Sequence, residues 1–480
     1  MLNLRDENYR ISFSHNQFEA AIVTHGDEKE DVTYSGAFAT RVKGVRKDLV
    51  RYVLVPDSTE VDRDEYFVEP NPHFTCKLQN LFRKEGANTV VNLHWHKFTE
   101  SGKQPNFFSE DDRCAFALFE NISQFNPSIR VVQIVFGASI NYFKARYMDK
   151  DKKFVYFDSI EIVGPQGIKI LNSGKEFDVQ ISINDFKEIF RKNILAFGNE
   201  NTSKISKIKV AVVGVGGLGS GIVYQMARIG FEDVILMDFD RISEDNCNRF
   251  YGTDLPQKAR GKLKAEFVMK KYQCFNPNAT VQCYYGSVLD EKAEEILKEV
   301  DLIIMTVDND GTRVSLNSFC ARYGKPLVNV STGISMDKDG SLIKSAGTQI
   351  QWFIPRESEY PCLRCHGSMD EEEIQMGLMS EELRESRKTA GYIEGTDQNP
   401  APQIMPLNGI GIGIAMWEIC CWICGIKKPI PWLYYDAMEN KLMNIKVSQK
   451  SDCTCCRLNE ESILATGDYK PNLKIKILNR

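Results

Sequence analysis

The stretch VVGVGGLGSG, residues 212–221, decides the fold of the C-terminal part of this chain. It continues an apolar run of strand type that starts at Ile208, and a segment of helical type follows it. Glycines at such a junction let the backbone approach phosphate groups, and the first turn of the helix offers free N–H groups and a positive dipole end. The stretch therefore predicts a nucleotide-binding loop formed by Gly214, Gly216, Gly217 and Gly219.

Apolar runs of strand type alternate with segments of helical type beyond Lys207. This alternation is typical of a doubly wound, largely parallel α/β sheet of the Rossmann kind. Asp238 ends the second run, about 20 residues after the glycines, where a carboxylate can accept hydrogen bonds from ribose hydroxyls. These features alone also fit an NAD-dependent oxidoreductase, because one glycine motif does not separate a dinucleotide site from an ATP site. The runs are residues 208–215, 232–238, 279–286, 301–307 and 325–331.

The composition is that of a folded chain with more than one domain. A length of 480 residues implies two or three domains, and 42% apolar with 26% charged residues fits globular packing. The net charge of −5 argues against nucleic-acid binding. The N-terminal residues show no signal-peptide pattern, and Glu418 interrupts the apolar run 410–426, which predicts a buried helix. We expect a cytoplasmic protein that binds neither nucleic acid nor a membrane.

Three segments are expected along the chain. Residues 1–165 contain short β-branched runs with few helical stretches, which predicts an α+β domain. Residues 166–206 are predicted to form a linker that holds a helix over 185–197 and then a polar stretch. Residues 207–480 carry the doubly wound pattern and form the last domain.

Motifs beyond the glycine loop decide which kind of nucleotide site is present. In chain order they are GVGGLGSG, LMDFDRISEDNCNRF, GKLKAE, TVDNDGTR, PCLRC, MPLNGIGIGIAMWE and DCTCC. This ordered set resembles the adenylating enzymes of the HesA/MoeB/ThiF and ubiquitin-activating family, over roughly residues 190–457. The resemblance implies that ATP and Mg²⁺ are used to adenylate the C-terminal carboxylate of a ubiquitin-like protein with an exposed tail.

The same resemblance gives roles to residues of the nucleotide site. Asp238 corresponds to the ribose ligand, and Asp308 corresponds to the carboxylate that holds Mg²⁺. The negative charge that accumulates as pyrophosphate leaves must be met by cations. Arg249 offers a bidentate fork and Lys264 a point charge for this purpose. Two further residues complete the expected nucleotide-binding set, Asp240 and Asn246.

An additional basic residue is expected to act between subunits. The family often carries an arginine ahead of the domain that reaches the ATP site of a partner subunit. The segment FRKNILAFG, residues 190–198, occupies that place, and either Arg191 or Lys192 is the counterpart. The resemblance therefore implies a homodimer.

Two C-x-x-C pairs stand far apart in the sequence, Cys362 with Cys365 and Cys453 with Cys456. Two such pairs predict a closed, tetrahedral zinc site, with Cys455 as the spare thiol. They match the structural zinc site of the resembled family.

The segment between the first cysteine pair and the last apolar helix, residues 366–409, contains no cysteine. Family members that form a thioester place a cysteine there. The acyl adenylate is therefore expected to pass directly to an acceptor or to a thiol of a conjugating-enzyme partner, with Cys247 beside the phosphate-binding residues as a third option. A small ribosomal peptide stays open as an alternative substrate.

A second candidate site lies in NLHWHKFTESGKQPNFFSEDD, residues 92–112. His94 and His96 stand two residues apart at the end of a predicted strand, so both imidazoles point to one face. With a nearby carboxylate they match a catalytic zinc that has three protein ligands and an open position for water. Asp112 is the expected third ligand, with Asp111 or Glu110 as substitutes.

This segment resembles the JAMM (MPN) metallopeptidase signature, in which His-x-His precedes Ser-x-x-Asp. Ser109 to Asp112 supply the second part, and Glu19 corresponds to the upstream glutamate. Zinc lowers the pKa of its bound water to about 7. Glu19 is expected to take that proton and pass it to the leaving amine, and Ser109 is expected to donate to the oxyanion.

Both sites would recognise the same flexible C-terminal tail. We therefore expect a bifunctional enzyme, which adenylates the tail of a ubiquitin-like protein and cleaves (iso)peptide bonds next to it. The alternative is an adenylating enzyme alone, whose N-terminal part is a degenerate JAMM-like binding module.

Overall fold

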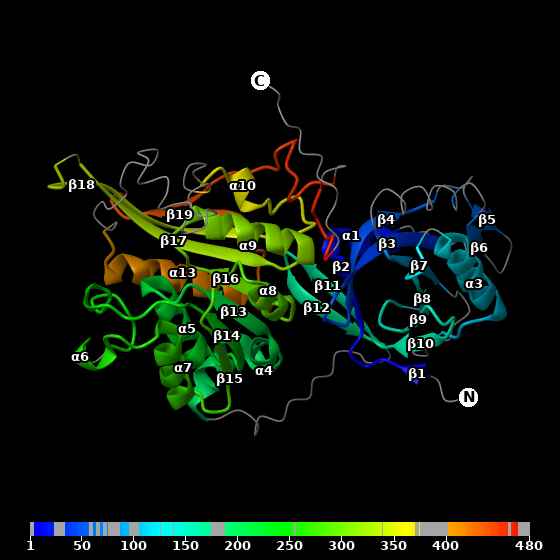
Figure 1. Cartoon of the computed structure of the whole chain (residues 1–480), viewed down its shortest axis with the longest axis horizontal. Helices are drawn as coiled ribbons and strands as arrows, with labels where there is room; N and C mark the ends of the chain where they lie inside the picture. The colour runs from blue at the N-terminus through cyan, green and yellow to red at the C-terminus, as the bar shows by residue number, and fades with distance from the viewer. Residues whose placement is uncertain are drawn as a thin grey trace.

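The computed structural model describes fifteen stretches of the chain, and the statements below concern these stretches: residues 4–23, 34–56, 61–63, 68–70, 74, 87–95, 105–124, 126–137, 139–173, 188–253, 256–337, 339–369, 374, 402–458 and 462–468. Two sheets organise them, one for each half of the chain (Figure 1). The N-terminal half lies on the right of Figure 1 and the C-terminal half on the left.

The N-terminal sheet has ten strands in the order β1-β10-β9-β8-β7-β3-β4-β2-β11-β12. A separate pair is formed by β5 (Val61–Arg63) and β6 (Val68–Pro70). The strands of the large sheet are β1 (Leu4–Arg5), β2 (Arg10–Ser14), β3 (Tyr34–Val42), β4 (Lys47–Leu54), β7 (Thr89–Trp95), β8 (Arg130–Phe136), β9 (Phe143–Met148), β10 (Phe154–Phe157), β11 (Ser159–Gly164) and β12 (Gly167–Asn172).

Two helices cover opposite faces of this sheet. The alternation of side chains along β7 divides its apolar residues between two clusters: Val91 and Leu93 pack with Phe18 of α1 (His15–Val23), whereas Val90 packs with Leu118 of α3 (Ser109–Ser123). His94 has the parity of Val90 and therefore faces the α3 side. Three acidic residues in the first turn of α3 suit the positive end of the helix dipole.

The C-terminal sheet has eight strands in the order β15-β14-β13-β16-β17-β18-β19-β20. The first five pair in parallel and the last three are antiparallel, so the predicted doubly wound core is confirmed and extended by a meander. The strands are β13 (Lys209–Val213), β14 (Asp233–Met237), β15 (Thr280–Tyr284), β16 (Leu302–Met305), β17 (Leu327–Met336), β18 (Ile343–Phe353), β19 (Trp432–Asp436) and β20 (Lys441–Asn444).

Helices cover both faces of this sheet, as a doubly wound fold requires. One apolar cluster joins the sheet to α4, α5, α7 and α13, and a second joins the other face to α8, α9 and α10. Their bounds are α4 (Arg191–Lys207), α5 (Gly217–Ile229), α7 (Lys264–Phe275), α8 (Glu291–Lys298), α9 (Asp310–Tyr323), α10 (Leu363–His366) and α13 (Met405–Ile423), with α6 (Pro256–Ala259), η2 (Glu188–Phe190) and η3 (Glu244–Asn246) as short additions.

Two predicted boundaries are shifted in the structure. The hairpin β11–β12 keeps residues as far as Asn172 in the N-terminal sheet, beyond the boundary expected at residue 165. Within the described residues, the helix expected over 185–197 comprises η2 from Glu188 and then α4, which continues to Lys207 although Gly198 at φ 79° interrupts it. Glycine tolerates this positive φ, so the polar stretch forms a second helical piece instead of an extended link.

The apolar run around Glu418 forms α13, which is the one helix in the described part of the chain long and apolar enough to cross a membrane. Two thirds of its apolar window, 67%, is buried inside the protein, and it packs on α5, β17 and β18. Glu418 is buried and paired with Lys427. These contacts confirm the prediction of a buried core helix.

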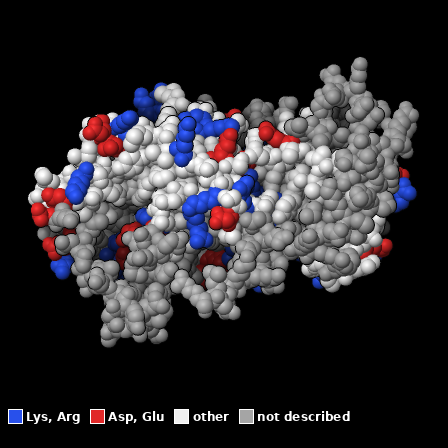
Figure 2. All heavy atoms as spheres, turned by 90° about the horizontal axis from the view of Figure 1, so that it is seen from above, with Lys and Arg blue, Asp and Glu red and all other residues white. Residues whose placement is uncertain are grey.

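The two halves share an interface of buried polar contacts. The Arg356 guanidinium, just after β18, donates to the carbonyl oxygens of Ser12 (2.9 Å) and Val50 (3.0 Å) in the N-terminal sheet. Burial lowers the pKa of Arg356 to about 10. Trp422 on α13 donates from its indole N–H to the carbonyl of Gly164 at 2.8 Å. Figure 2 shows the upper face of the molecule, where cationic and anionic side chains are interspersed over the described residues.

A buried ion pair lies at this interface. Both carboxylate oxygens of Glu161 are 2.7 Å from the Lys47 ammonium. Burial alone would raise the pKa of Glu161, but attraction and hydrogen bonding by Lys47 outweigh it and lower the pKa to about 2. A carboxylate whose pKa falls on folding stabilises the native state above its unfolded pKa of about 4.3, and this contribution is lost as the pH falls toward 2.

We predict that Glu161→Gln lowers the free energy of unfolding at neutral pH by on the order of 3 kcal/mol. The deficit should shrink as the pH falls from about 4.5 toward 2, because the wild-type carboxylate then becomes protonated as well. Urea unfolding at a series of pH values measures this, with the exposed Glu120→Gln as the control. A deficit that does not change with pH would exclude the ionic contribution.

Candidate functional site

A cavity of about 660 Å³ opens at the carboxyl ends of β13, β14 and β16. The strand order places it at the switch point, where β14 lies on one side of β13 and β16 on the other. Three of the four predicted loop glycines line it, without Gly219, together with the other predicted nucleotide-binding residues: Gly214, Gly216, Gly217, Asp238, Asp240, Asn246, Arg249, Lys264 and Asp308. Residues that stand up to 94 positions apart in the sequence are therefore brought to one cavity.

Close backbone packing forms the glycine loop. A Cβ atom at Gly219 would lie 2.1 Å from the carbonyl oxygen of Gly214, and Gly214 itself has φ +85°. The hydroxyl of Thr306, at the end of β16, donates to the same Gly214 carbonyl at 2.6 Å. Gly216, in contrast, faces open space within 4 Å of its Cβ position. The loop is thus fixed on its inner side and accessible to a ligand on its outer side.

Asp238 anchors the loop to the end of β14. Its carboxylate accepts from the backbone N–H of Val215 at 2.7 Å and from that of Asp240 at 2.8 Å. Burial raises the pKa of Asp238, and these two bonds oppose the rise. The carboxylate lines the cavity while its backbone partners fix its position, which suits the predicted role of a ribose acceptor.

The cations of the cavity are held by neighbouring polar groups. The ammonium of Lys264 lies 2.8 Å from the carboxylate of Asp240. Arg249 donates to the backbone carbonyl of Asp245 at 2.6 Å and, from Nε, to the side-chain oxygen of Gln403 at 3.0 Å. Gln403 also lines the cavity, and sequence reasoning missed it because no motif connects the residue before α13 with Arg249.

The two basic residues proposed to act between subunits lie away from these contacts. Arg191 begins α4, its side chain is 70% exposed, and it pairs with Glu188 at 3.1 Å. Lys192 is exposed beside it. Neither residue lines the cavity of its own chain as the structure describes it.

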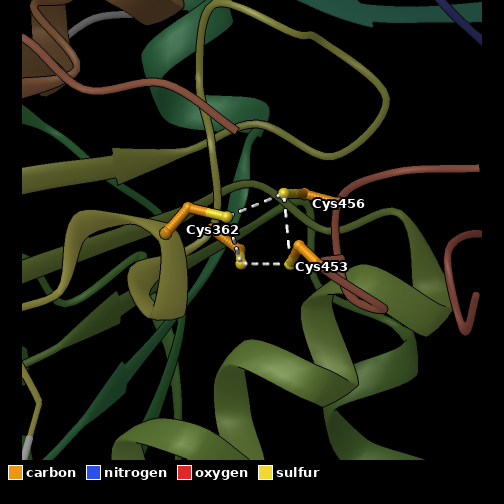
Figure 3. Close-up of side chains that lie close together, drawn as sticks. Cys362, Cys453 and Cys456 are labelled. Carbon is orange, nitrogen blue, oxygen red and sulfur yellow. Dashed lines mark hydrogen bonds between the residues drawn. The ribbon is translucent and has the colours of Figure 1, made fainter. Parts of the chain in front are cut away.

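The four predicted cysteines converge next to α9 (Figure 3). Their sulfur atoms lie within 4.8 Å of one another, with separations of 3.5 Å for Cys362–Cys453 and 3.4 Å for Cys365–Cys456. A tetrahedral zinc with bonds of about 2.3 Å separates its sulfur ligands by about 3.8 Å. The backbone N–H of Lys450 points at the sulfur of Cys365 at 3.3 Å, which favours a thiolate. The donor set therefore fits zinc.

In the N-terminal half, the structure places a different carboxylate next to the first histidine. The Nε2 atom of His94 lies 2.8 Å from Asp111, and its Nδ1 atom lies 3.2 Å from the side-chain oxygen of Asn92. Asp112 instead pairs with Arg146 at 2.6 Å. Consecutive residues of a helix point about 100° apart, so Asp111 alone of the two faces β7. The carboxylate next to His94 is therefore that of Asp111, which the sequence offered as a substitute, and not that of the expected ligand Asp112.

The other residues expected around His94 are not gathered there in the described structure. Glu19 is an exposed residue of α1, 3.5 Å from His15, and α1 covers the opposite face of the sheet. Glu19, the expected base, therefore lies on the other face of the sheet from His94. Ser109 is the exposed first residue of α3 and its hydroxyl donates to Glu110 at 2.9 Å. His96 lies outside the described residues.

The parallel sheet, the glycine loop at its switch point and the cavity define a doubly wound α/β protein of the nucleotide-binding class. A family model described as the ThiF family matches residues 190–456. Because this match covers more than half of the 480 residues, the chain belongs to the ThiF family.

Two curated relatives are similar to parts of this chain. The sulfur carrier protein adenylyltransferase of Thermus thermophilus is 33% identical over 133 residues, which is 27% of this chain and 48% of that protein. The ubiquitin-like modifier-activating enzyme 5 of Xenopus laevis is 25% identical over 283 residues, which is 57% of this chain and 65% of that protein. The chain thus spans less than two thirds of either relative. Among solved structures, E. coli MccB with ATP superposes with a TM-score of 0.43 at 18% identity, covering 58% of this chain and 76% of that chain.

We predict that the Cys453→Ser variant binds one zinc fewer per chain than the wild type. Because that metal joins two distant segments, its loss should also lower the melting temperature by about 5 °C or more. Elemental analysis of the purified protein and thermal unfolding measure the two effects. The matched control is Cys274→Ser, an exposed cysteine outside the cluster, and equal zinc content in both variants would contradict the site.

Proposed function

We propose that this protein is an ATP-dependent adenylyltransferase that activates the C-terminal carboxylate of a ubiquitin-like or sulfur-carrier protein. The observation that carries the proposal is the single cavity that holds the glycine loop, Asp238, two cations and the carboxylate of Asp308. Membership of the ThiF family supports the adenylating reaction over hydride transfer.

The chemistry of the reaction explains why the cavity needs these residues. A carboxylate oxygen of the substrate attacks the α-phosphorus of ATP, the bond from that phosphorus to the bridging oxygen breaks, and pyrophosphate leaves with the electron pair. Negative charge grows on the phosphate oxygens as this happens. Lys264 and Arg249 stabilise that charge, and Arg249 is held for this task by Gln403 and the Asp245 carbonyl.

The exposed carboxylate of Asp308 fits a magnesium ion, because it lies at the end of β16 and lines the cavity. When bound, Mg²⁺ would neutralise phosphate charge. Asp238, whose position is set by two backbone N–H groups, would accept from the ribose. Each of these roles belongs to a side chain that already has a defined place in the cavity.

The class of substrate is supported by the relatives. Their names specify a sulfur carrier protein in one case and a ubiquitin-like modifier in the other, and both substrates are proteins that the relatives activate. A small peptide is the alternative substrate, since its terminal carboxylate would make the same bond. We also propose a homodimer, in which the exposed Arg191 reaches the cavity of the second chain.

A zinc peptidase in the N-terminal half is a second candidate function. One contact favours it: Nε2 of His94 and an oxygen of Asp111 lie 2.8 Å apart, and both side chains are largely buried. This is a hydrogen-bond distance, whereas a tetrahedral zinc would hold the two ligand atoms about 3.3 Å apart, so the two side chains would have to separate slightly to take up a metal ion. The position of Glu19 on the other face of the sheet counts against the catalytic base expected there, so this proposal concerns metal binding first.

We predict that Lys264→Ala and Arg249→Ala each slow ATP–pyrophosphate exchange by about 10²- to 10³-fold, because each removes a cation from the developing charge. Exchange of labelled pyrophosphate into ATP is measured with a panel of ubiquitin-like proteins, each compared with a form that lacks its last residues. The exposed Lys270→Ala on the same helix is the matched control and should keep full exchange. Exchange that does not depend on the protein tail would overturn the proposed substrate class.

We further predict that the wild-type chain binds a second zinc in addition to the cysteine-bound ion, and that His94→Ala and Asp111→Asn each lose it. Zinc is counted by elemental analysis, which requires no substrate. His15→Ala, a histidine on the other face of the sheet, is the matched control. A single zinc per wild-type chain would contradict the zinc-peptidase proposal. Loss of the second zinc in Asp112→Asn but not in Asp111→Asn would show that Asp112 is the ligand, as expected from the sequence.

A further inference from the structure

One side-chain amide beside the cavity has a donor without an acceptor. Asn408, in the first turns of α13, is fully buried. Its side-chain oxygen accepts from the hydroxyl of Thr332 on β17 at 2.9 Å, which leaves the amide nitrogen on the side of the glycine loop. Its Nδ2 atom has no hydrogen-bond partner among the described residues. Leaving a buried donor unpaired is costly, so a built-in donor of this kind indicates a ligand oxygen that completes it.

The amide points at the glycine loop. A Cβ atom at Gly217 would stand 2.7 Å from Nδ2 of Asn408 and 3.1 Å from Cγ of Arg249. Gly217 lines the cavity and is the first residue of α5. Because Gly217 has no side chain, the amide of Asn408 and the aliphatic part of the Arg249 side chain can both lie against the first turn of α5.

The end of α13 favours an anion at this place. The helix is 19 residues long, and its N-cap residue Ile404 supplies no side-chain cap. The residue before it, Gln403, lines the cavity and holds Arg249. The positive end of the α13 dipole, the guanidinium and the unpaired amide thus surround one side of the cavity.

The place of Asn408 relative to the strands indicates which part of the cavity receives the acid substrate and which part receives the nucleotide. The residues expected to bind ATP follow β13, β14 and β16, whereas Thr332 lies on β17 and α13 packs on β17 and β18. The amide therefore approaches the loop from the β17 side of the cavity, where Gly217 and Arg249 lie next to it. In an in-line displacement the attacking carboxylate must lie opposite the leaving pyrophosphate, so it needs a binding group of its own.

We propose that Asn408 binds the reacting carboxylate of the acid substrate, by donating a hydrogen bond from its side-chain amide beside Gly217. Thr332 is a positioning residue, because it acts only by orienting that amide. The inference rests on the proposed adenylation and names the part of the cavity that receives the acid. It applies equally to a protein tail and to a peptide, since both present a terminal carboxylate.

The test compares two ligands that share the nucleotide and differ in the acyl group. Adenosine monophosphate occupies the nucleotide part alone, whereas in glycyl-sulfamoyl-adenosine a sulfamoyl group replaces the phosphate and carries the acyl carbonyl of the acyl adenylate. Calorimetry gives both dissociation constants. We expect the wild type to bind the acyl compound more tightly than the monophosphate, and we call the ratio of the two affinities the acyl gain. In Asn408→Asp this ratio should fall about tenfold, while the affinity for the monophosphate stays within about twofold of the wild type.

Two further variants separate binding from folding. Asn276→Asp replaces an equally buried amide at the end of α7, whose donor already has the Phe231 carbonyl as acceptor, and should keep the full acyl gain even if it lowers the melting temperature. Thr332→Val keeps the volume but frees the amide, and should reduce the gain by about threefold.

Each outcome decides between the proposals. An Asn408→Asp variant that keeps the acyl gain, or that loses both ligands equally, overturns the role of Asn408. A wild type that binds the monophosphate but gains nothing from the acyl group overturns it too, while leaving the nucleotide site in place. A wild type that binds neither compound overturns the proposed adenylation itself.

Discussion

The packing of α5 against the loop after β13 is the contact on which the cavity depends. The distance between the Gly219 position and the Gly214 carbonyl leaves no room for any side chain, and the hydroxyl of Thr306 holds the same carbonyl from the neighbouring strand. This double restraint aligns the first turn of α5 with the ends of β14 and β16. Asp238, the cations and Asp308 can then face one space although their elements are far apart in the sequence.

A second constraint is the interface between the two sheets. Arg356 inserts a buried guanidinium into the N-terminal sheet and donates there to backbone carbonyls, while Val42 and Leu49 join the apolar cluster beneath α9. A buried cation whose donors are satisfied by fixed carbonyls tolerates little displacement. The His94–Asp111 contact lies on the α3 face of the N-terminal sheet, so it belongs to a surface separate from the nucleotide cavity.

Much of the nucleotide half could be predicted from local sequence. The glycine loop, the five parallel strands and the four cysteines follow from short-range patterns, because residue type and spacing determine which backbone conformation or donor set is possible there. The N-terminal site was less predictable. Asp111 and Asp112 are equivalent by spacing, and only the rotation of α3 against β7 decides which carboxylate reaches His94.

Glu19 shows the same limit on a larger scale. Its place depends on which face of a ten-stranded sheet its helix covers, and this is set by contacts between residues more than 70 positions apart. Gln403 and Asn408 were invisible for a related reason. Amide side chains carry no distinctive spacing, and their roles arise only once α13 lies beside α5 and β17.

The cysteine cluster also constrains the part of the chain that lies between its two cysteine pairs. Its two halves flank residues 366–452, so a bound metal closes a loop that contains α13, β19 and β20. Closing a loop of this length removes conformational freedom that the open chain would keep. Both amides that α13 and its preceding residue present to the cavity, Gln403 and Asn408, lie on this loop. A metal bound by the four cysteines would therefore act as a cross-link that limits how far these two amides can move away from the cavity.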